Sequence, residues 1–266
     1  MSLKLMPPTS RSRFLSYRAL PPFTSAHSPL IIAGARISPP LQDAIIKLAA
    51  ASKAKFIAAE NVYMYGNTHG QPMTEENPYN PCSKKGAVRA EMTKTVFDAH
   101  HRGEIRAATV RGSDFWGPWE PINGAMLFKA ALQRKTLNML GDLNQPHTFT
   151  YVKDFGRALA IAGTQDSALG QTWHVPSGQP YSQNQLTELI SKELGYPLKN
   201  RASGKMVLSV LGLFNKAAKE MVEMLYEFNE PFILDATAME QTFGLQPTPM
   251  QQRIRETLQW AKTSLS

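Results

Sequence analysis

From Leu41 onward, hydrophobic positions alternate between the spacing of helices and that of short strands. Apolar residues from Leu41 to Ala49 recur at the spacing of one helix face, and 55–59 is a short apolar run typical of a buried strand. The expected helices cover 41–49, 84–101, 122–133 and 151–162. The expected strands cover 55–59, 105–110 and 172–175. This alternation predicts an α/β fold with a mostly parallel sheet covered by helices on both faces.

The C-terminal part has a different pattern. Ser182 followed by Gln185 is a capping-box signal for the start of a helix, and 204–227 is expected to form a longer helix rich in Met and Leu. Thr248 with Pro249 repeats a helix-start signal before a final amphipathic segment. We therefore expect a small, mainly helical lobe on the substrate side.

The first 30 residues show no periodicity and include two Pro-Pro pairs. The pattern predicts three parts: a disordered or irregular segment over 1–37, an α/β unit over 38–178 and the helical lobe over 179–266.

The net charge of +8 and the pI near 9.5 suggest a nucleic-acid partner at first, but the distribution of the charges along the chain does not. Residues 1–42 contain basic side chains and no acid, whereas the remainder is nearly balanced. We therefore expect no nucleic-acid partner. The Arg- and Ser-rich, acid-free start is compatible with a mitochondrial transit peptide, the alternative being a cytoplasmic protein.

Three classes of protein are disfavoured by composition. The lone Cys82 excludes an internal disulfide framework and a cysteine-rich zinc site. Apolar runs such as 205–214 are shorter than the ~20 residues of a membrane span, so no membrane partner is expected. The histidines have no metal-ligand spacing with carboxylates, so no metal site is expected.

A polar stretch directly follows the strand that ends at Ala59. In open α/β sheets ligands bind beyond the carboxyl ends of the strands. Tyr63 and Tyr65 alternate with apolar residues there, so both are expected to point to one side. A tyrosine near a lysine can exchange a proton with a hydroxyl compound. The same pattern also fits tyrosines at the edge of the core whose hydroxyls reach water.

Several segments together resemble one family. Asn-Val-Tyr-Met-Tyr-Gly at 61–66, Glu-Glu-Asn-Pro at 75–78, a helix led by lysine, and Thr-Val-Arg-Gly-Ser-Asp-Phe-Trp-Gly-Pro at 109–118 are similar to the extended short-chain dehydrogenase/reductase superfamily, in its NAD-dependent epimerase/dehydratase branch. The resemblance covers about 38–262. It implies a partial Rossmann-like, doubly wound sheet, NAD or NADP as cofactor, and a small carbonyl or hydroxyl compound as substrate.

The resemblance also implies roles for individual residues. Tyr63 or Tyr65 would be the proton donor and Lys85 would hold the nicotinamide ribose. Asn61 and Ser113 would also lie at the cofactor, while Asp114 and His147 would meet the substrate. Lys85 also fits a solvated lysine at a helix start, and Asp114 a capping residue.

The sequence departs from the family pattern at two motifs. The family's Tyr-x-x-x-Lys pair is missing, because Asn80 precedes Lys84 by four residues and Pro81 precedes Lys85 by four. The glycine-rich pyrophosphate motif is missing as well, since the glycine after Gly34 is Gly66.

These departures leave three hypotheses. His147 stands where sugar-nucleotide members have a phosphate-binding arginine, which disfavours a nucleotide-sugar substrate. The leading hypothesis is an NAD(P)-dependent epimerase/dehydratase or oxidoreductase, which could be a homodimer. The alternatives are a non-catalytic binding module of the same fold, and an inactive product truncated at its N-terminus.

Overall fold

A computed structural model describes residues 34–204, 206, 208–209 and 221–265. Its central sheet has three parallel strands in the order β1 (Lys55–Glu60), β2 (Arg106–Arg111) and β6 (Thr172–His174). These strands lie where the sequence predicted them. The parallel pairing confirms the expected fold class.

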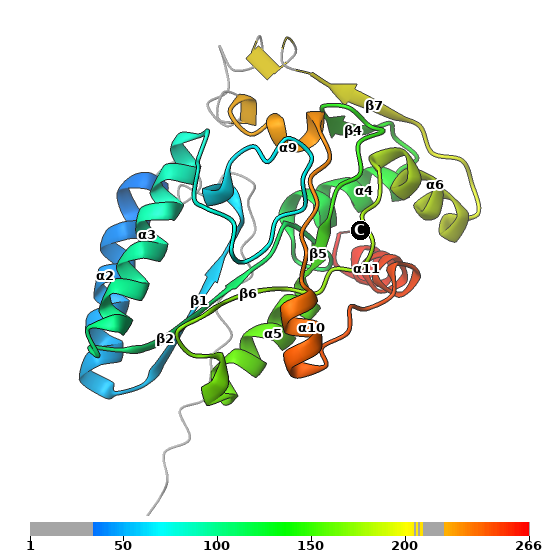
Figure 1. The fold of residues 1–266 in the computed structure, drawn as a ribbon. Helices are drawn as coiled ribbons and strands as arrows, with labels where there is room; N and C mark the ends of the chain where they lie inside the picture. The colour runs from blue at the N-terminus through cyan, green and yellow to red at the C-terminus, as the bar shows by residue number, and fades with distance from the viewer. Residues whose placement is uncertain (1–33, 205, 207, 210–220, 266) are drawn as a thin grey trace, which may run out of the picture.

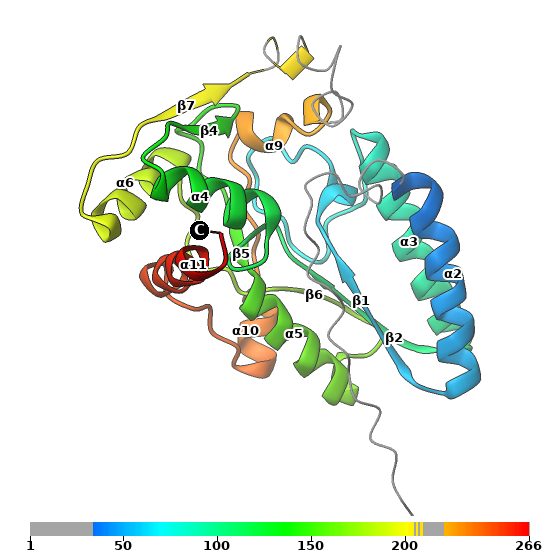
Figure 2. The same ribbon diagram turned by 180° about the vertical axis from the view of Figure 1, so that it is seen from behind.

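Helices cover both faces of this sheet (Figure 1). On one face α2 (Gly34–Ser52) and α3 (Lys84–His101) pack side by side, and on the other lies α5 (Val152–Thr164), as the reverse view in Figure 2 shows. Alternation along β2 divides the core, because Ala107 packs with the first pair of helices whereas Ala108 and Val110 pack with α5.

The second lobe is built on two short parallel pairs. β3 (Asp114–Trp116) pairs with β5 (Phe149–Tyr151), and β4 (Leu137–Leu140) pairs with β7 (Asn200–Ser203). The helical segments around these pairs are a π-helix, η2 (Pro121–Met126), then α4 (Leu127–Leu132), α6 (Gln183–Leu194), α9 (Tyr226–Asn229) and α11 (Met250–Ser264). By contrast, α10 (Thr237–Phe243) packs against β6 of the central sheet.

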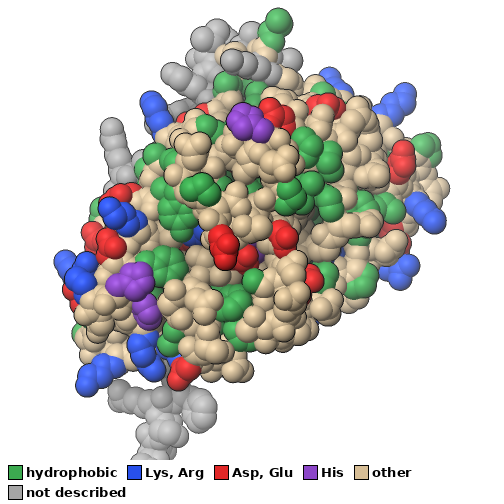
Figure 3. Space-filling model, in the orientation of Figure 1, with side chains coloured by type: hydrophobic (Ala, Val, Ile, Leu, Met, Phe, Trp, Pro, Cys, Tyr) green, Lys and Arg blue, Asp and Glu red, His purple; other side chains and the backbone are tan. Residues whose placement is uncertain are grey.

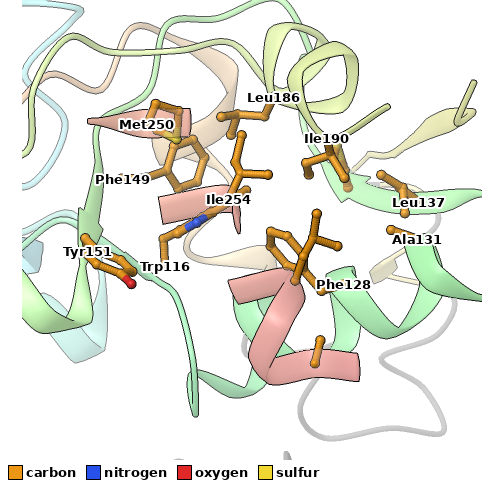
Figure 4. Close-up of a cluster of buried hydrophobic side chains, with 13 residues drawn as sticks. Trp116, Phe128, Ala131, Leu137, Phe149, Tyr151, Leu186, Ile190, Met250 and Ile254 are labelled. Carbon is orange, nitrogen blue, oxygen red and sulfur yellow. The ribbon is translucent and has the colours of Figure 1, made fainter. Parts of the chain in front are cut away.

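The core of this lobe joins distant parts of the chain (Figure 4). Trp116 and Phe128 pack edge to face at 5.2 Å and meet Ile190 and Ile254 in one buried cluster. Residues before 179 thus share a hydrophobic core with residues after it.

The first helix differs from its prediction. It begins at Gly34 rather than Leu41 and includes Pro39 and Pro40. Residues 34–37 of the expected irregular segment are therefore helical, and 1–33 lie outside the described residues. Of the predicted apolar face, Ile46 and Ala49 are buried, but three members point to solvent: Leu41, Ile45 and Leu48. The spacing of apolar residues predicts the helix but does not identify the face that packs against the core.

The C-terminal helix signals are partly confirmed. Ser182 and Gln185 form the predicted capping box of α6. Pro249, not Thr248, occupies the N-cap position of the last helix, without a side-chain cap, and the Thr248 hydroxyl donates to Asp154 Oδ1 at 2.6 Å. Most of the expected helix over 204–227 lies outside the described residues. Among the helices that are described, none is both long and apolar enough to cross a membrane.

Candidate active site

Three strands of the sheet end side by side at its carboxyl edge. The register places Glu60 opposite Arg111, and Arg111 opposite His174. Polar side chains from three segments therefore converge where ligands bind in folds of this kind. On the face drawn in Figure 3, acidic side chains lie near the centre, where the segment between β1 and α3 crosses the sheet in Figure 1.

A buried network, the Arg111 cluster, surrounds the end of β2. The Arg111 side chain, fully excluded from solvent, donates to Glu60 Oε2 at 2.9 Å and to the Tyr65 hydroxyl at 2.6 Å, and it also bonds the Tyr79 hydroxyl. Tyr65 in turn donates to His174 Nε2 at 2.7 Å. Burial lowers the pKa of His174 to about 3, so its ring is neutral and donates from Nδ1 to the Asp235 carbonyl.

Strand-like alternation predicts that Tyr63 and Tyr65 point to one side, and the structure shows that they do not. Residues 63–65 form a 3₁₀ helix, so successive side chains turn about an axis instead of alternating. Tyr65 belongs to the Arg111 cluster, whereas the phenol of Tyr63 lies among Glu227, Asp114 and Arg89. Burial, Glu227 and Asp114 raise the pKa of Tyr63, and burial also raises the pKa of Tyr65.

The start of α3 approaches this turn closely. A Cβ on Gly86 would lie 2.4 Å from the Tyr63 carbonyl oxygen, so only glycine permits the approach. Ser83 caps the helix by accepting from Gly86 N at 3.0 Å. Lys85, in the first turn of α3, is close enough to favour the ionised form of Glu227 and so to act on its pKa.

Asp114 and His147 meet at the beginning of β3. Asp114 Oδ2 lies 3.0 Å from His147 Nε2, although the two atoms are not aligned for a hydrogen bond. The His147 ring is 2% exposed and lies against Phe149, Phe228 and Phe232, the Phe228 ring being parallel at 4.7 Å. Its Nδ1 is 3.0 Å from the Glu227 carbonyl oxygen. These contacts fix the imidazole plane against the acid.

Glu227, on α9, was not singled out from the sequence. It is 1% exposed, and burial together with Asp114 raises the pKa of its carboxyl well above the ordinary value. Glu120, whose carboxyl accepts from Gly124 N at 2.9 Å, likewise has its pKa raised by burial, to about 7. The sequence signal was only an acid between Tyr226 and Phe228, which does not reveal burial.

Buried polar atoms without hydrogen bonds gather in this region. Among the described residues, those nearest to it are Ser113 Oγ, Asp114 Oδ2, His147 Nε2, Tyr226 Oη and Glu227 Oε1. Such atoms are uncommon in folded proteins and each needs a physical reason. We call Tyr63, Asp114, His147 and Glu227 the Asp114 site.

The remaining candidates have mixed surroundings. Ser113 is buried and its amide donates to Thr150 Oγ1 at 2.9 Å, which leaves its hydroxyl unpartnered within the described part of the chain. Asn61 Oδ1 accepts from Tyr63 N at 3.4 Å and so supports the turn. Asn80, four residues before Lys84, is exposed.

Comparison with known proteins identifies the family. The model of the NAD dependent epimerase/dehydratase family matches residues 36–175, more than half of the chain. The chain belongs to this family. The resemblance inferred from the sequence is thereby confirmed.

The fold of this chain is similar to that of solved structures. A dTDP-glucose 4,6-dehydratase from Streptomyces venezuelae with NAD bound aligns with a TM-score of 0.70 at 17% identity, covering 90% of this chain and 71% of that one. A UDP-glucuronic acid 4-epimerase from Bacillus cereus in complex with NAD aligns with a TM-score of 0.68 at 16% identity, covering 85% and 67%.

Two curated relatives match over a shorter part of their length. The 3beta-hydroxysteroid-dehydrogenase/decarboxylase isoforms 2 and 1 of Arabidopsis thaliana are 24% and 25% identical over 65% and 64% of this chain. The chain spans 34% and 39% of their lengths.

The cofactor in the family's name is NAD, and some of the described residues are suited to its nicotinamide end. The Ser113 hydroxyl is buried and has no hydrogen-bond partner among the described residues, and Lys85 stands at the start of α3. A hydroxyl and an ammonium of this kind are chemically suited to the hydroxyls of a nicotinamide ribose. A pyrophosphate needs a glycine-rich turn before a helix. No such turn occurs in the described ranges, and at α3 the amides of Lys84 and Gly86 already donate to Glu223 and Ser83.

Proposed function

We propose that this chain is an NAD(P)-dependent epimerase/dehydratase-type or oxidoreductase-type enzyme for a small carbonyl or hydroxyl compound, with its chemistry at the Asp114 site. The observation that supports the proposal is the group of buried polar atoms without hydrogen bonds that come from β3, from His147 in the segment before β5, and from α9. The similar solved structures contain bound NAD, which favours the same cofactor here.

Each residue of the proposed site has one task. Lys85 and Ser113 would hold the nicotinamide ribose, and the bound nicotinamide would supply hydride transfer. Asp114 Oδ2 would accept a hydrogen bond from the substrate hydroxyl, while His147 keeps that carboxylate in place. Tyr63, whose raised pKa keeps its phenol protonated, would donate a hydrogen bond to the substrate oxygen.

Tyr65 is not assigned a chemical step. Its hydroxyl accepts from Arg111 and donates to His174, so both functions of that oxygen are already used within the protein. We assign it to the support of the strand ends.

The proposal is tested by titrating the full chain with NADH and following nicotinamide fluorescence. Saturable binding that weakens about tenfold in Lys85→Ala but not in the matched control Lys84→Ala supports it, since Lys84 is exposed. No binding, or equal loss in both variants, would contradict it. Turnover is then followed by NADH absorbance with a panel of small ketones and aldehydes.

A non-catalytic binding module is the second candidate. It is favoured by Asn80 and Pro81 in place of a phenol one helical turn before the lysines. Tight NADH binding without oxidation by any member of the panel would support this function over the enzyme.

A further inference from the structure

The acid composition of the Asp114 site restricts what can enter it. Asp114 and Glu227 lie close enough for Asp114 to raise the pKa of Glu227, and Asp114 acts on the Glu120 carboxyl in the same direction. A second negative charge near the buried Glu227 carboxyl is unfavourable, and the state of lower free energy keeps that carboxyl protonated.

Glu227 is the member with an unused oxygen. Its carboxyl is 1% exposed, and Oε1 has no hydrogen-bond partner among the described residues. A protonated carboxyl has an O–H donor as well as an acceptor, so a buried one without a partner is costly. A ligand oxygen placed beside Asp114 and Tyr63 would remove that cost.

We propose, building on the function assigned above, that Glu227 is a neutral carboxylic acid that hydrogen-bonds the oxygen of an uncharged carbonyl or hydroxyl ligand, and that the site thereby selects uncharged ligands over anions.

The groups around Glu227 support this charge preference. Asp114 comes from β3, Tyr63 from the 3₁₀ turn, Tyr226 from α9, and Cys82 and Lys85 from the start of α3. The Tyr226 hydroxyl and Lys85 favour the ionised form, but burial, Asp114 and Cys82 outweigh them. His147 contacts the Glu227 backbone and the Asp114 carboxylate, and Arg89 faces Tyr63. A ligand carboxylate or phosphate would add a negative charge beside Asp114 in a site of low dielectric constant.

The first arm of the test is infrared difference spectroscopy of the full chain without NADH. At about pH 8.5, where the Glu120 carboxyl is largely ionised, we expect the C=O stretch of a protonated carboxyl in the wild type. The band is lost in Glu227→Gln and kept in the matched control Glu230→Gln, whose side chain is 43% exposed.

A second variant covers the case in which Glu227→Gln does not fold. Asp114→Asn removes the neighbouring negative charge, so the pH at which the band disappears falls by about one unit or more. A wild type without the band, a band that survives Glu227→Gln, or an unchanged midpoint in Asp114→Asn overturns the proposal.

The second arm uses ligands matched in size. Hydroxyacetone and propane-1,2-diol, which are neutral, are expected to shift the band by hydrogen-bonding to it, whereas pyruvate and lactate are not. Anions that shift the band as much as the neutral compounds, or neutral compounds that leave it unchanged, overturn the proposal. Because NADH is absent from both arms, a failure of cofactor binding is a separate result and contradicts only the proposed function.

Discussion

Replacing Tyr65 by Phe removes one oxygen from the centre of the Arg111 cluster. That hydroxyl accepts from Arg111 Nη1 at 2.6 Å and donates to His174 Nε2 at 2.7 Å, in a location where all three side chains are at most 2% exposed. The variant leaves a charged donor and an imidazole nitrogen without this partner and without access to water.

The size of the effect follows from these two bonds. A hydrogen bond to a charged group contributes about 1.5–3 kcal/mol and a neutral one about 1 kcal/mol, so we expect a loss of about 2–4 kcal/mol in the free energy of unfolding. The comparison variant is Tyr196→Phe, which loses a single bond to the Ala131 carbonyl at 3.0 Å and should cost about 1 kcal/mol.

Urea unfolding followed by tryptophan fluorescence measures both variants. NADH affinity of folded Tyr65→Phe should stay within about twofold of the wild type, since the hydroxyl is used inside the protein. The reasoning is refuted if Tyr65→Phe is no less stable than Tyr196→Phe, or if it retains full stability but binds NADH tenfold more weakly.

Three further predictions concern stability. Because the pKa of His174 is about 3 in the folded protein, the unfolded chain binds an extra proton below about pH 6.5. The free energy of unfolding should therefore fall from pH 7 to 4, and this residue should contribute a slope of up to about 1.4 kcal/mol per pH unit. Urea unfolding at several pH values should give a smaller slope for His174→Gln. Ile46→Ala should lower the free energy of unfolding by about 2–4 kcal/mol, and Leu48→Ala by less than about 0.5 kcal/mol, because only Ile46 is buried. Thermal and urea unfolding measure both variants, and equal losses in the two variants would contradict the orientation of α2. Asp154→Asn should cost about 3 kcal/mol, because the buried carboxylate accepts from Thr248 and Arg157 at 2.6 Å each; a variant as stable as wild type in urea would show that these bonds contribute little.

Local signals in the sequence were sufficient for the longer helices and for the three strands of the central sheet. The bounds of α3 and the capping box of α6 follow from patterns within a few residues, and the structure agrees with them. The inner side of α2 depends on which neighbours cover it, so Leu41 and Leu48 were assigned to the wrong side. Spacing alone contains no information on that choice.

The candidate site was predictable only in part. Asp114 follows a strand and could be found from that position, and its neighbour His147 was named from resemblance. Tyr63 and Tyr65 were given one orientation because a 3₁₀ turn was not foreseen. Glu227 is 80 residues beyond His147, whose Nδ1 meets its carbonyl oxygen, and no local pattern reveals a contact at that separation.

His147 connects parts of the chain that are far apart in sequence. Its backbone exchanges hydrogen bonds with Tyr181 at 3.1 and 3.0 Å, the amides of Thr148 and Phe232 bond across the adjoining bridge at 2.9 Å each, and its ring is stacked on Phe228. The magnetic environment of this one imidazole therefore depends on how the segment around Phe228 and Phe232 is seated. Its carbon-bound protons should resonate upfield through ring currents, so a single pair of NMR signals would report whether that segment is docked during ligand binding.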